Sequence, residues 1–191
     1  MEPSPEITLL IGAWQRGDPN AENALFEALY RRLHGIALQC LRNEAPGQTL
    51  GATALVHEAY LRFHNAESLT ITNRAHFLAL AARVMRRILV DRARARRSAK
   101  RDARMVQEDE AEMFLITVRE ADQILAVDRA LEGLSLQSPR QARLVELRYF
   151  AGFSEDESAT ALGISSRQAR RDWQVARTRL RIAIDGTADP A

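Results

Sequence analysis

A short turn built on Gly163 separates two stretches of helical periodicity, and this pattern constrains the fold more than any other feature of the chain. The first stretch opens on Ser154, a capping residue followed by three carboxylates, which suit the positive end of a helix. Gly163 then ends that helix, Ile164 fills the angle, and Ser165 or Ser166 caps the next helix. Two helices joined in this way are typical of a helix-turn-helix.

The second helix of this pair carries two opposite faces. Four apolar residues recur at steps of four, three and four, and we expect this narrow arc to pack inward: Ala169, Trp173, Ala176 and Leu180. The other side is rich in guanidinium groups, with Asp172 as its one acid: Arg167, Arg170, Arg171, Gln174, Arg177 and Arg181. A solvated basic face is the alternative interpretation. A basic ridge directly after a glycine turn favours insertion into a DNA major groove.

A second basic surface lies in the first half of the chain. From Arg83 to Arg104 the sequence holds ten basic residues against Asp91 and Asp102, a local net charge of +8. Several of the arginines share one arc of a predicted helix, away from its apolar stripe, and a phosphate backbone is the natural partner of such a density. A solubilising face and an anionic-lipid patch are alternatives, but the stretch lacks the large apolar residues that interfacial helices insert.

Composition and periodicity predict an all-α chain with two small domains. Of the 191 residues, 46% are hydrophobic but only 6% are aromatic, which favours helices packed through aliphatic side chains in two modest cores. We place the first domain at residues 1–102 and the second at residues 122–185, followed by a tail at 186–191. An acidic linker is expected over residues 103–121, where solvated charge is favoured over a metal site.

Several classes of protein are disfavoured by the same sequence. Cys40 is the only cysteine, so the chain has neither a disulfide of its own nor a thiolate metal cluster. The four histidines form no metal-ligand pair at helical spacing, and no glycine-rich phosphate loop is present, so neither a metal nor a cofactor is expected and an enzyme ranks last. No apolar run is long enough for a membrane span and no export signal is evident, so a cytoplasmic protein without membrane contact is expected.

These two helical modules together resemble the bacterial extracytoplasmic-function sigma factors over nearly the whole chain. Residues 6–100 are similar to region 2, most clearly in NRAHFLALAARVMRRILVDRARARRSAKR. Residues 122–183 are similar to region 4, in SPRQARLVELRYFAGFSEDESATALGISSRQARRDW. The resemblance implies a subunit without catalytic residues that binds core RNA polymerase, directs it to promoter DNA and departs after initiation.

The resemblance also implies site residues. Region 4 would read the minus-35 element and meet the polymerase flap, with DNA contacts from Ser166, Arg167, Gln168, Arg170, Arg171, Gln174 and Arg177. Region 2 would melt and read the minus-10 element through Arg83, Arg86, Arg87, Arg94 and Arg97. The clamp helices of the largest polymerase subunit would receive Leu55, Val56, Glu58 and Leu61.

The chain departs from the family pattern at two places. Gly51-Ala52-Thr53-Ala54 stands where most members carry an acidic tetrapeptide, and Ser158 stands where an aliphatic residue usually packs. Phosphorylation of Thr53 by a Ser/Thr protein kinase would restore negative charge at a helix start. Thr53 as a simple helix cap is the alternative, and an anti-sigma protein is another possible regulator. The competing function is a stand-alone helix-turn-helix regulator that binds duplex DNA without polymerase.

Overall fold

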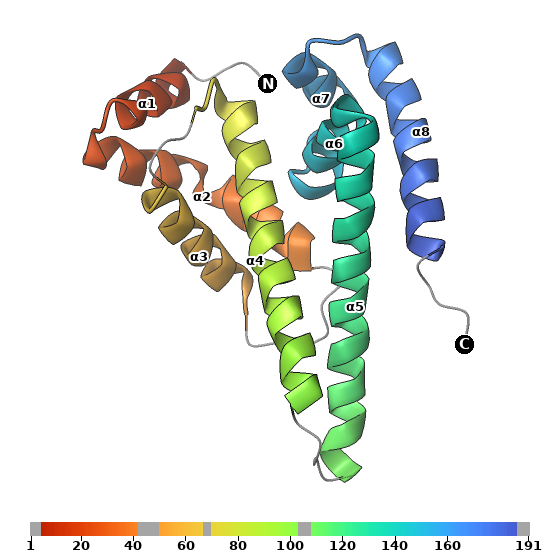
Figure 1. Ribbon diagram of the computed structural model, residues 1–191. Helices are drawn as coiled ribbons and strands as arrows, with labels where there is room; N and C mark the ends of the chain where they lie inside the picture. Colours follow the sequence, from red (N-terminus) through yellow and green to blue (C-terminus); the bar gives the residue numbers. More distant parts are fainter. Residues whose placement is uncertain (1–4, 42–49, 67–69, 103–107, 187–191) are drawn as a thin grey trace.

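The computed structural model describes residues 5–41, 50–66, 70–102 and 108–186, and every regular element within these ranges is helical (Figure 1). The N-terminal half contains α1 (Pro5–Gln15), α2 (Pro19–Leu41), α3 (Ala52–His64) and α4 (Arg74–Asp102). The C-terminal half contains α5 (Glu108–Gln137), α6 (Pro139–Val145) with its π-helical continuation η1 (Glu146–Phe150), α7 (Glu155–Leu162) and α8 (Ser166–Asp185). The all-α prediction is confirmed. None of these helices combines the length and hydropathy that a membrane span needs.

Proline marks the start of three helices, as the sequence predicts. α1, α2 and α6 begin at Pro5, Pro19 and Pro139, where the missing amide hydrogen of proline costs no hydrogen bond. At the start of α2, the Asp18 carboxylate also accepts a hydrogen bond from the Asn20 amide at 2.9 Å. These local signals fix the helix starts before any tertiary contact forms.

The core of the N-terminal half is an aromatic cluster around Phe77 of α4. The Phe77 ring is fully buried, and its centroid lies 5.5 Å from that of Phe26 and 5.4 Å from that of Phe63. Trp14 of α1 meets the edge of Phe77 at 6.2 Å. Helices α1, α2 and α3 therefore assemble on one side of α4 through large, geometrically specific contacts.

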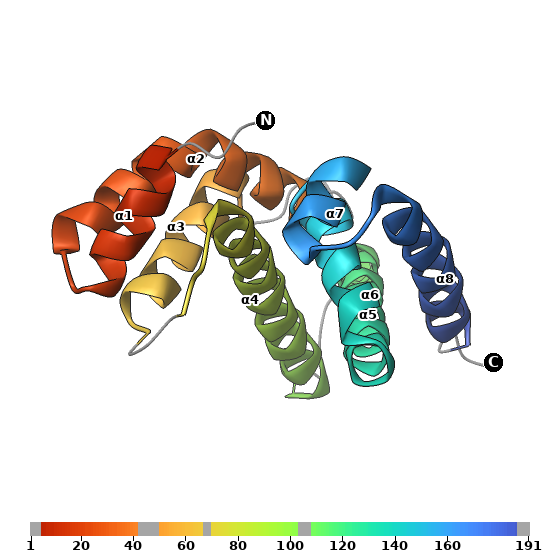
Figure 2. The same cartoon turned by 90° about the horizontal axis from the view of Figure 1, so that it is seen from above.

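The other side of α4 packs along α5, and both views show these two long helices side by side (Figures 1 and 2). We call the contact of α4 with α5 and η1 the joint. The main hydrophobic cluster is continuous across it, because Met85 and Ile88 of α4 belong to the same cluster as Leu131 and Leu134 of α5. The two modest cores that we expected are therefore joined by packing across the joint in this conformation, and the C-terminal half keeps a further small cluster around Leu144, Ala159 and Ala169.

Helix α5 begins earlier than expected. It starts at Glu108, inside the stretch 103–121 that we expected to act as a linker, and continues without a break to Gln137. No proline occurs in this helix and its first glycine is Gly133, while Glu, Ala, Met and Leu are good helix formers. The acidic stretch is thus helical from Glu108 onward, and the remaining positions 103–107 lie outside the described residues.

Candidate nucleic-acid interface

Helices α7 and α8 form the helix-turn-helix that the Gly163 pattern predicts. The Ser154 hydroxyl accepts a hydrogen bond from the Glu157 amide at 3.2 Å, and the Glu157 carboxylate accepts one from the Ser154 amide at 2.8 Å. This reciprocal cap lowers the pKa of Glu157, since the amide bond favours the ionised carboxyl. Gly163 has φ +66°, the left-handed conformation that ends α7, and Ile164 packs in the small core between the helices.

The inward face of α8 follows the predicted arc, with one addition. Ala169 and Ala176 are fully buried, and Trp173 is half-buried with the Arg148 guanidinium 4.4 Å from the centre of its ring. Asp172 also faces inward rather than joining the basic ridge. Its carboxylate accepts hydrogen bonds from Arg140 and from Gln168, both at 2.8 Å. Asp172 thereby ties α8 to α6, and it adds no negative charge to the exposed basic side of α8.

The outward face of α8 separates the seven predicted minus-35 contacts into two groups. Three of them are engaged within the protein: Ser166 donates to Asp156 at 2.6 Å, Gln168 donates to Asp172, and Arg170 pairs with Glu155 at 2.9 Å. The other four are exposed and, among the described residues, have no hydrogen-bond or ion-pair partner for their side chains: Arg167, Arg171, Gln174 and Arg177. We call these four the free ridge.

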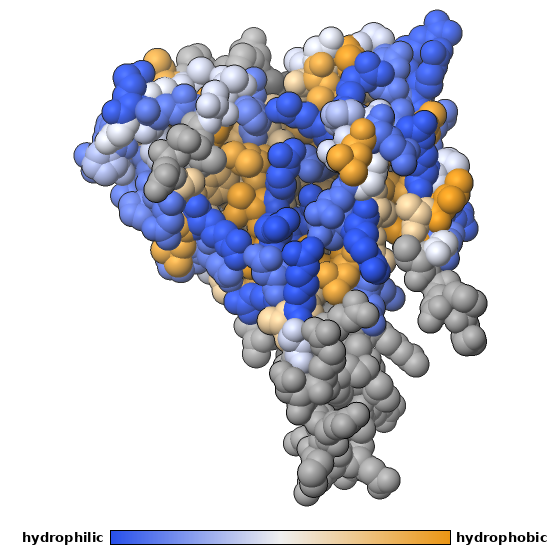
Figure 3. All heavy atoms as spheres, in the orientation of Figure 1, coloured by the Kyte–Doolittle hydropathy of each residue, from blue (hydrophilic) through white to orange (hydrophobic). Residues whose placement is uncertain are grey.

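The free ridge lies on an outer helix of the molecule. Figure 2 shows α8 at the opposite end of the fold from α1, with α6 and α7 on its inner side. The space-filling view shows hydrophilic side chains over the upper part of α8 (Figure 3). The turn, the buried alanine face and the buried acid hold the backbone of α8 in place, so its exposed arginines project from a fixed helix.

The basic surface of α4 is arranged differently from the prediction. Arg83 binds Glu146 of η1 through two hydrogen bonds of 2.7 and 3.2 Å, and Arg86 contacts both Asp128 and Glu146. Arg94 lies 3.7 Å from Asp128. Three of the five predicted minus-10 residues therefore pair with acids of the C-terminal half, and of these Arg86 is largely buried whereas Arg83 and Arg94 stay about half exposed. Of the other two, Arg87 lies 3.8 Å from Asp91, and the side chain of Arg97 is outside the described residues.

The polymerase-contact prediction on α3 needs a correction. Leu55 is 0% exposed and Val56 is 4% exposed, so these two side chains belong to the core and cannot reach a partner in this conformation. Glu58 is at the surface and accepts a hydrogen bond from Arg92 at 2.9 Å, while Leu61 is 46% exposed. Helical periodicity identifies the apolar residues of α3, but it does not show which of them pack in the core of this protein and which stay exposed for a partner.

The start of α3 carries no side-chain cap. Its N-cap residue is Gly51, which makes no side-chain hydrogen bond, and no acid occurs in the first turn. Thr53 lies one position beyond the first helical residue and is exposed. The alternative that Thr53 caps this helix is therefore wrong, and the first turn itself supplies no negative charge to its amide groups.

Ser158 is the second departure from the family pattern, and it is fully buried in α7. Its hydroxyl has no hydrogen-bond partner among the described residues. Replacing Ser158 with alanine removes this unsatisfied group, so we expect the free energy of unfolding to rise by about 1 kcal/mol. Urea denaturation followed by circular dichroism measures the change. A lower unfolding free energy for Ser158→Ala would show that the hydroxyl is satisfied in solution.

The described residues contain no group of three or more His, Cys, Asp or Glu side chains that is arranged to hold a metal ion. Cys40 lies at the joint, where burial raises the pKa of its thiol to about 12. The thiol therefore stays protonated at neutral pH and is a poor nucleophile. The chemistry available at these surfaces is the binding of phosphates and base edges.

Comparison with known protein families shows which family this chain belongs to. A family model described as ECF sigma factor matches residues 4–186, which is nearly the entire chain. The chain belongs to the ECF sigma factor family. No curated protein matches it. As an ECF sigma factor it is not an enzyme, and its family works with core RNA polymerase on promoter DNA to direct transcription initiation.

Proposed function

We propose that this sigma factor recognises promoters through two surfaces, with the free ridge of α8 reading the minus-35 element in the major groove. The observation that carries this proposal is the exposure of Arg167, Arg171, Gln174 and Arg177, which have no side-chain partner within the described residues, on the second helix of a capped helix-turn-helix. Ser166, Gln168 and Arg170 would then orient the helix more than contact DNA, because their side chains are engaged with acids.

The domain division follows from this assignment. Residues 1–102 would form the region 2-like domain that binds core polymerase and the minus-10 element, and residues 122–185 would form the region 4-like domain. Residues 103–121 would connect them and residues 186–191 would be a tail. The minus-10 surface would comprise Arg83, Arg86, Arg87, Arg94 and Arg97 of α4, once these side chains are available to DNA.

Run-off transcription with purified core polymerase tests the proposal directly. Promoter fragments selected from genomic DNA by the reconstituted holoenzyme serve as templates, and the expected result is a transcript that requires both the sigma factor and an intact minus-35 element. The competing function is a stand-alone regulator. Strong and sequence-specific retardation of the same fragments without core polymerase, combined with no transcript, would favour that alternative.

The exposed side of α3 is our candidate for the contact with the clamp helices of polymerase. Leu61 is a large apolar side chain on this side, and Glu58 lies one turn before it. We expect Leu61→Ala to weaken core binding about threefold to tenfold, which is ordinary for an apolar interface residue. Leu136→Ala is the matched control, since Leu136 of α5 is 89% exposed but lies outside this surface. Equal core affinity for both variants, measured by fluorescence anisotropy, would contradict the assignment.

Phosphorylation of Thr53 would complete this surface, and we propose it as the regulatory step. Three observations support it: Thr53 is exposed, it lies in the first turn of α3, and that turn has neither an acid nor a capping side chain. A phosphate there adds about two negative charges at the positive end of a helix dipole. A Ser/Thr protein kinase would be the partner, whereas control by an anti-sigma protein needs no modification.

Variants at Thr53 distinguish these two kinds of control. Thr53→Glu is expected to bind core polymerase more tightly than unmodified wild type, and Thr53→Ala is expected to stay weak after incubation with a cellular kinase fraction. Core binding and run-off transcription are measured for each protein, with mass spectrometry of the kinase-treated samples. Full activity of the unmodified wild type, equal to that of Thr53→Glu, would remove the switch.

A further inference from the structure

Ion pairs cross the joint between the two halves of the molecule. Three arginines of α4 take part, and their partners are Asp128 of α5 and Glu146 of η1. The joint pairs are Arg83–Glu146 at 2.7 Å, Arg86–Glu146 at 3.7 Å, Arg94–Asp128 at 3.7 Å and the closer contact Arg86–Asp128. All three arginines belong to the predicted minus-10 surface, so the same side chains have two mutually exclusive partners.

The two acids depend on these arginines. Asp128 is only 3% exposed and Glu146 only 7% exposed, and among the described residues all their ion-pair partners are on α4. A buried carboxylate without a compensating charge is strongly unfavourable, so the arginines cannot leave while the joint stays closed. The side chain of Arg86 is only 15% exposed, so its binding to DNA phosphate requires the two halves to separate at the joint. Arg83 and Arg94 are about half exposed, but their charges are compensated by the same two acids while the joint is closed.

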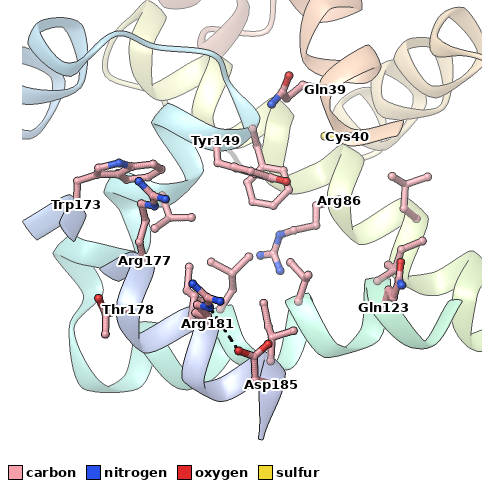
Figure 4. Close-up of a pocket in the computed structure, with 18 of the residues that line it drawn as sticks. Gln39, Cys40, Arg86, Gln123, Tyr149, Trp173, Arg177, Thr178, Arg181 and Asp185 are labelled. Carbon is pink, nitrogen blue, oxygen red and sulfur yellow. Dashed lines mark ion pairs between the residues drawn. The ribbon is translucent and has the colours of Figure 1, made fainter. Parts of the chain in front are cut away.

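The packing beside these ion pairs is incomplete. An open pocket of about 800 Å³ lies beside the joint and is lined by residues from both halves. Figure 4 shows Cys40 and Gln39 from the N-terminal half and Tyr149, Trp173 and Arg177 from the C-terminal half around this hollow, with Arg86 reaching into it. Atoms that line a cavity make fewer packing contacts, so this part of the joint depends on its ion pairs more than a filled core would.

We propose that the joint pairs form a latch, which holds the free sigma factor closed and withholds its minus-10 arginines from DNA until the halves separate. The inference rests on the proposed function of α4, but the closure itself is independent of it. We expect core polymerase to open the latch. A partner that holds the two halves apart binds the open state more tightly than the closed state, and it therefore shifts the population toward the open state. Free sigma factor would then bind promoter DNA poorly although it carries a complete set of arginines.

The test uses neutral isosteres of the two acids in the full-length chain. The latch variant is Asp128→Asn with Glu146→Gln, which keeps side-chain shape but removes both charges. The matched control is Glu27→Gln with Glu132→Gln, which also removes two negative charges but at positions outside the joint pairs. Glu27 of α2 and Glu132 of α5 are both exposed, and neither has an ion-pair partner among the described residues. Each single substitution is made as well, and circular dichroism checks the helix content of every protein.

Two measurements report on the free protein. Spin labels at Ala28→Cys of α2 and Ala161→Cys of α7, both exposed positions, give the distance between the halves in a Cys40→Ala background. Fluorescence anisotropy with a short duplex gives DNA affinity over a series of salt concentrations. We expect the latch variant to show longer label distances and about fivefold or tighter DNA binding, with a steeper salt dependence, because freed guanidinium groups release more counterions. The control should retain the wild-type distances.

Two results would overturn the latch: unchanged label distances in the latch variant, or longer distances with the same DNA affinity as the control. Run-off transcription separates this question from the proposed function. If the latch variant opens and binds DNA more tightly but neither protein supports a transcript with core polymerase, the latch stands and the promoter function falls. If wild type supports transcription but the joint never opens on removal of the charges, the promoter function stands and the latch falls.

Discussion

Replacing Arg167 and Arg171 together with alanine is expected to lower minus-35-dependent transcription about thirtyfold or more. Both side chains are exposed on the outer face of α8, and neither has a partner in the described part of the chain that would compete with DNA. Each contact to a base edge or phosphate contributes to the free energy of promoter binding, and the loss of two contacts is expected to lower promoter affinity by at least this factor. The measurement is run-off transcription at limiting holoenzyme, with the single variants alongside the double variant.

Two comparisons make this result specific. Arg179→Ala removes the same charge from the same helix, but Arg179 donates to Gln141 of α6 at 3.2 Å and lies on another side of α8, so transcription should change little. A template whose minus-35 element has been replaced should abolish the difference between wild type and the double variant. Equal loss of transcription on both templates would mean that the substitutions damage the fold or polymerase binding instead of recognition.

The contrast between Arg170 and its neighbours shows how the structure refines a sequence pattern. All the arginines of α8 look equivalent in a helical projection, yet Arg170 binds the Glu155 carboxylate of α7 through hydrogen bonds of 2.9 and 3.1 Å. This pair bridges the two helices of the motif. Arg170 is thus expected to hold the angle between α7 and α8, and its role in DNA binding is indirect. Glu155 is one of the three acids that follow Ser154, and the sequence pattern indicates only that these acids favour the start of a helix.

The helix-turn-helix could be predicted from sequence because its determinants are local. Ser154, Gly163 and Ser165 act on amide and carbonyl groups a few residues away, so they specify where α7 and α8 begin and end with little help from the rest of the chain. The family resemblance was also correct, since its motifs extend over both halves. What these signals leave open is how the helices face one another.

The orientation of α4 could not be predicted in this way. The stripe through Phe77, Ala81 and Ile88 suggests one buried face, but Leu78, Ala82 and Leu89 are buried as well, because α5 covers a second side. A helix between two neighbours has little free surface, and its basic residues are drawn into pairs across the joint. One sequence signal was available: Asp128 falls in the apolar arc with Ile124 and Leu131, and an acid in such an arc needs a buried cation.

The joint also explains why the predicted linker is not simply a spacer. Helix α5 extends from the acidic stretch into the C-terminal half without interruption. Contacts of Leu125, Asp128 and Leu131 with α4 fix its position beside that helix. The halves are therefore coupled through one pair of long helices. Any partner that binds α3 and α8 in a different relative arrangement must act against this contact, which is why polymerase binding and exposure of α4 are expected to occur together.

Phe77→Ala is expected to reduce the free energy of unfolding of the N-terminal half by about 3–5 kcal/mol, the ordinary cost of emptying a buried aromatic site. Phe77 is 0% exposed and contacts the rings of Trp14, Phe26 and Phe63, so three helices lose their common contact on α4. A loss of this size is a large fraction of the stability of an ordinary domain. Urea denaturation in a Trp173→Phe background measures it, since Trp14 then reports on this core alone.

The comparison for this variant is Leu9→Ala on α1, which removes an apolar side chain that is 71% exposed and should change the stability by less than about 0.5 kcal/mol. A loss below about 1 kcal/mol for Phe77→Ala would mean that the aromatic cluster does not organise this half. The functional consequence follows from the position of α4, which supports the α3 surface on one side and the joint on the other. Phe77→Ala should therefore impair core binding and promoter recognition together, whereas Arg167→Ala with Arg171→Ala should impair recognition with core binding intact.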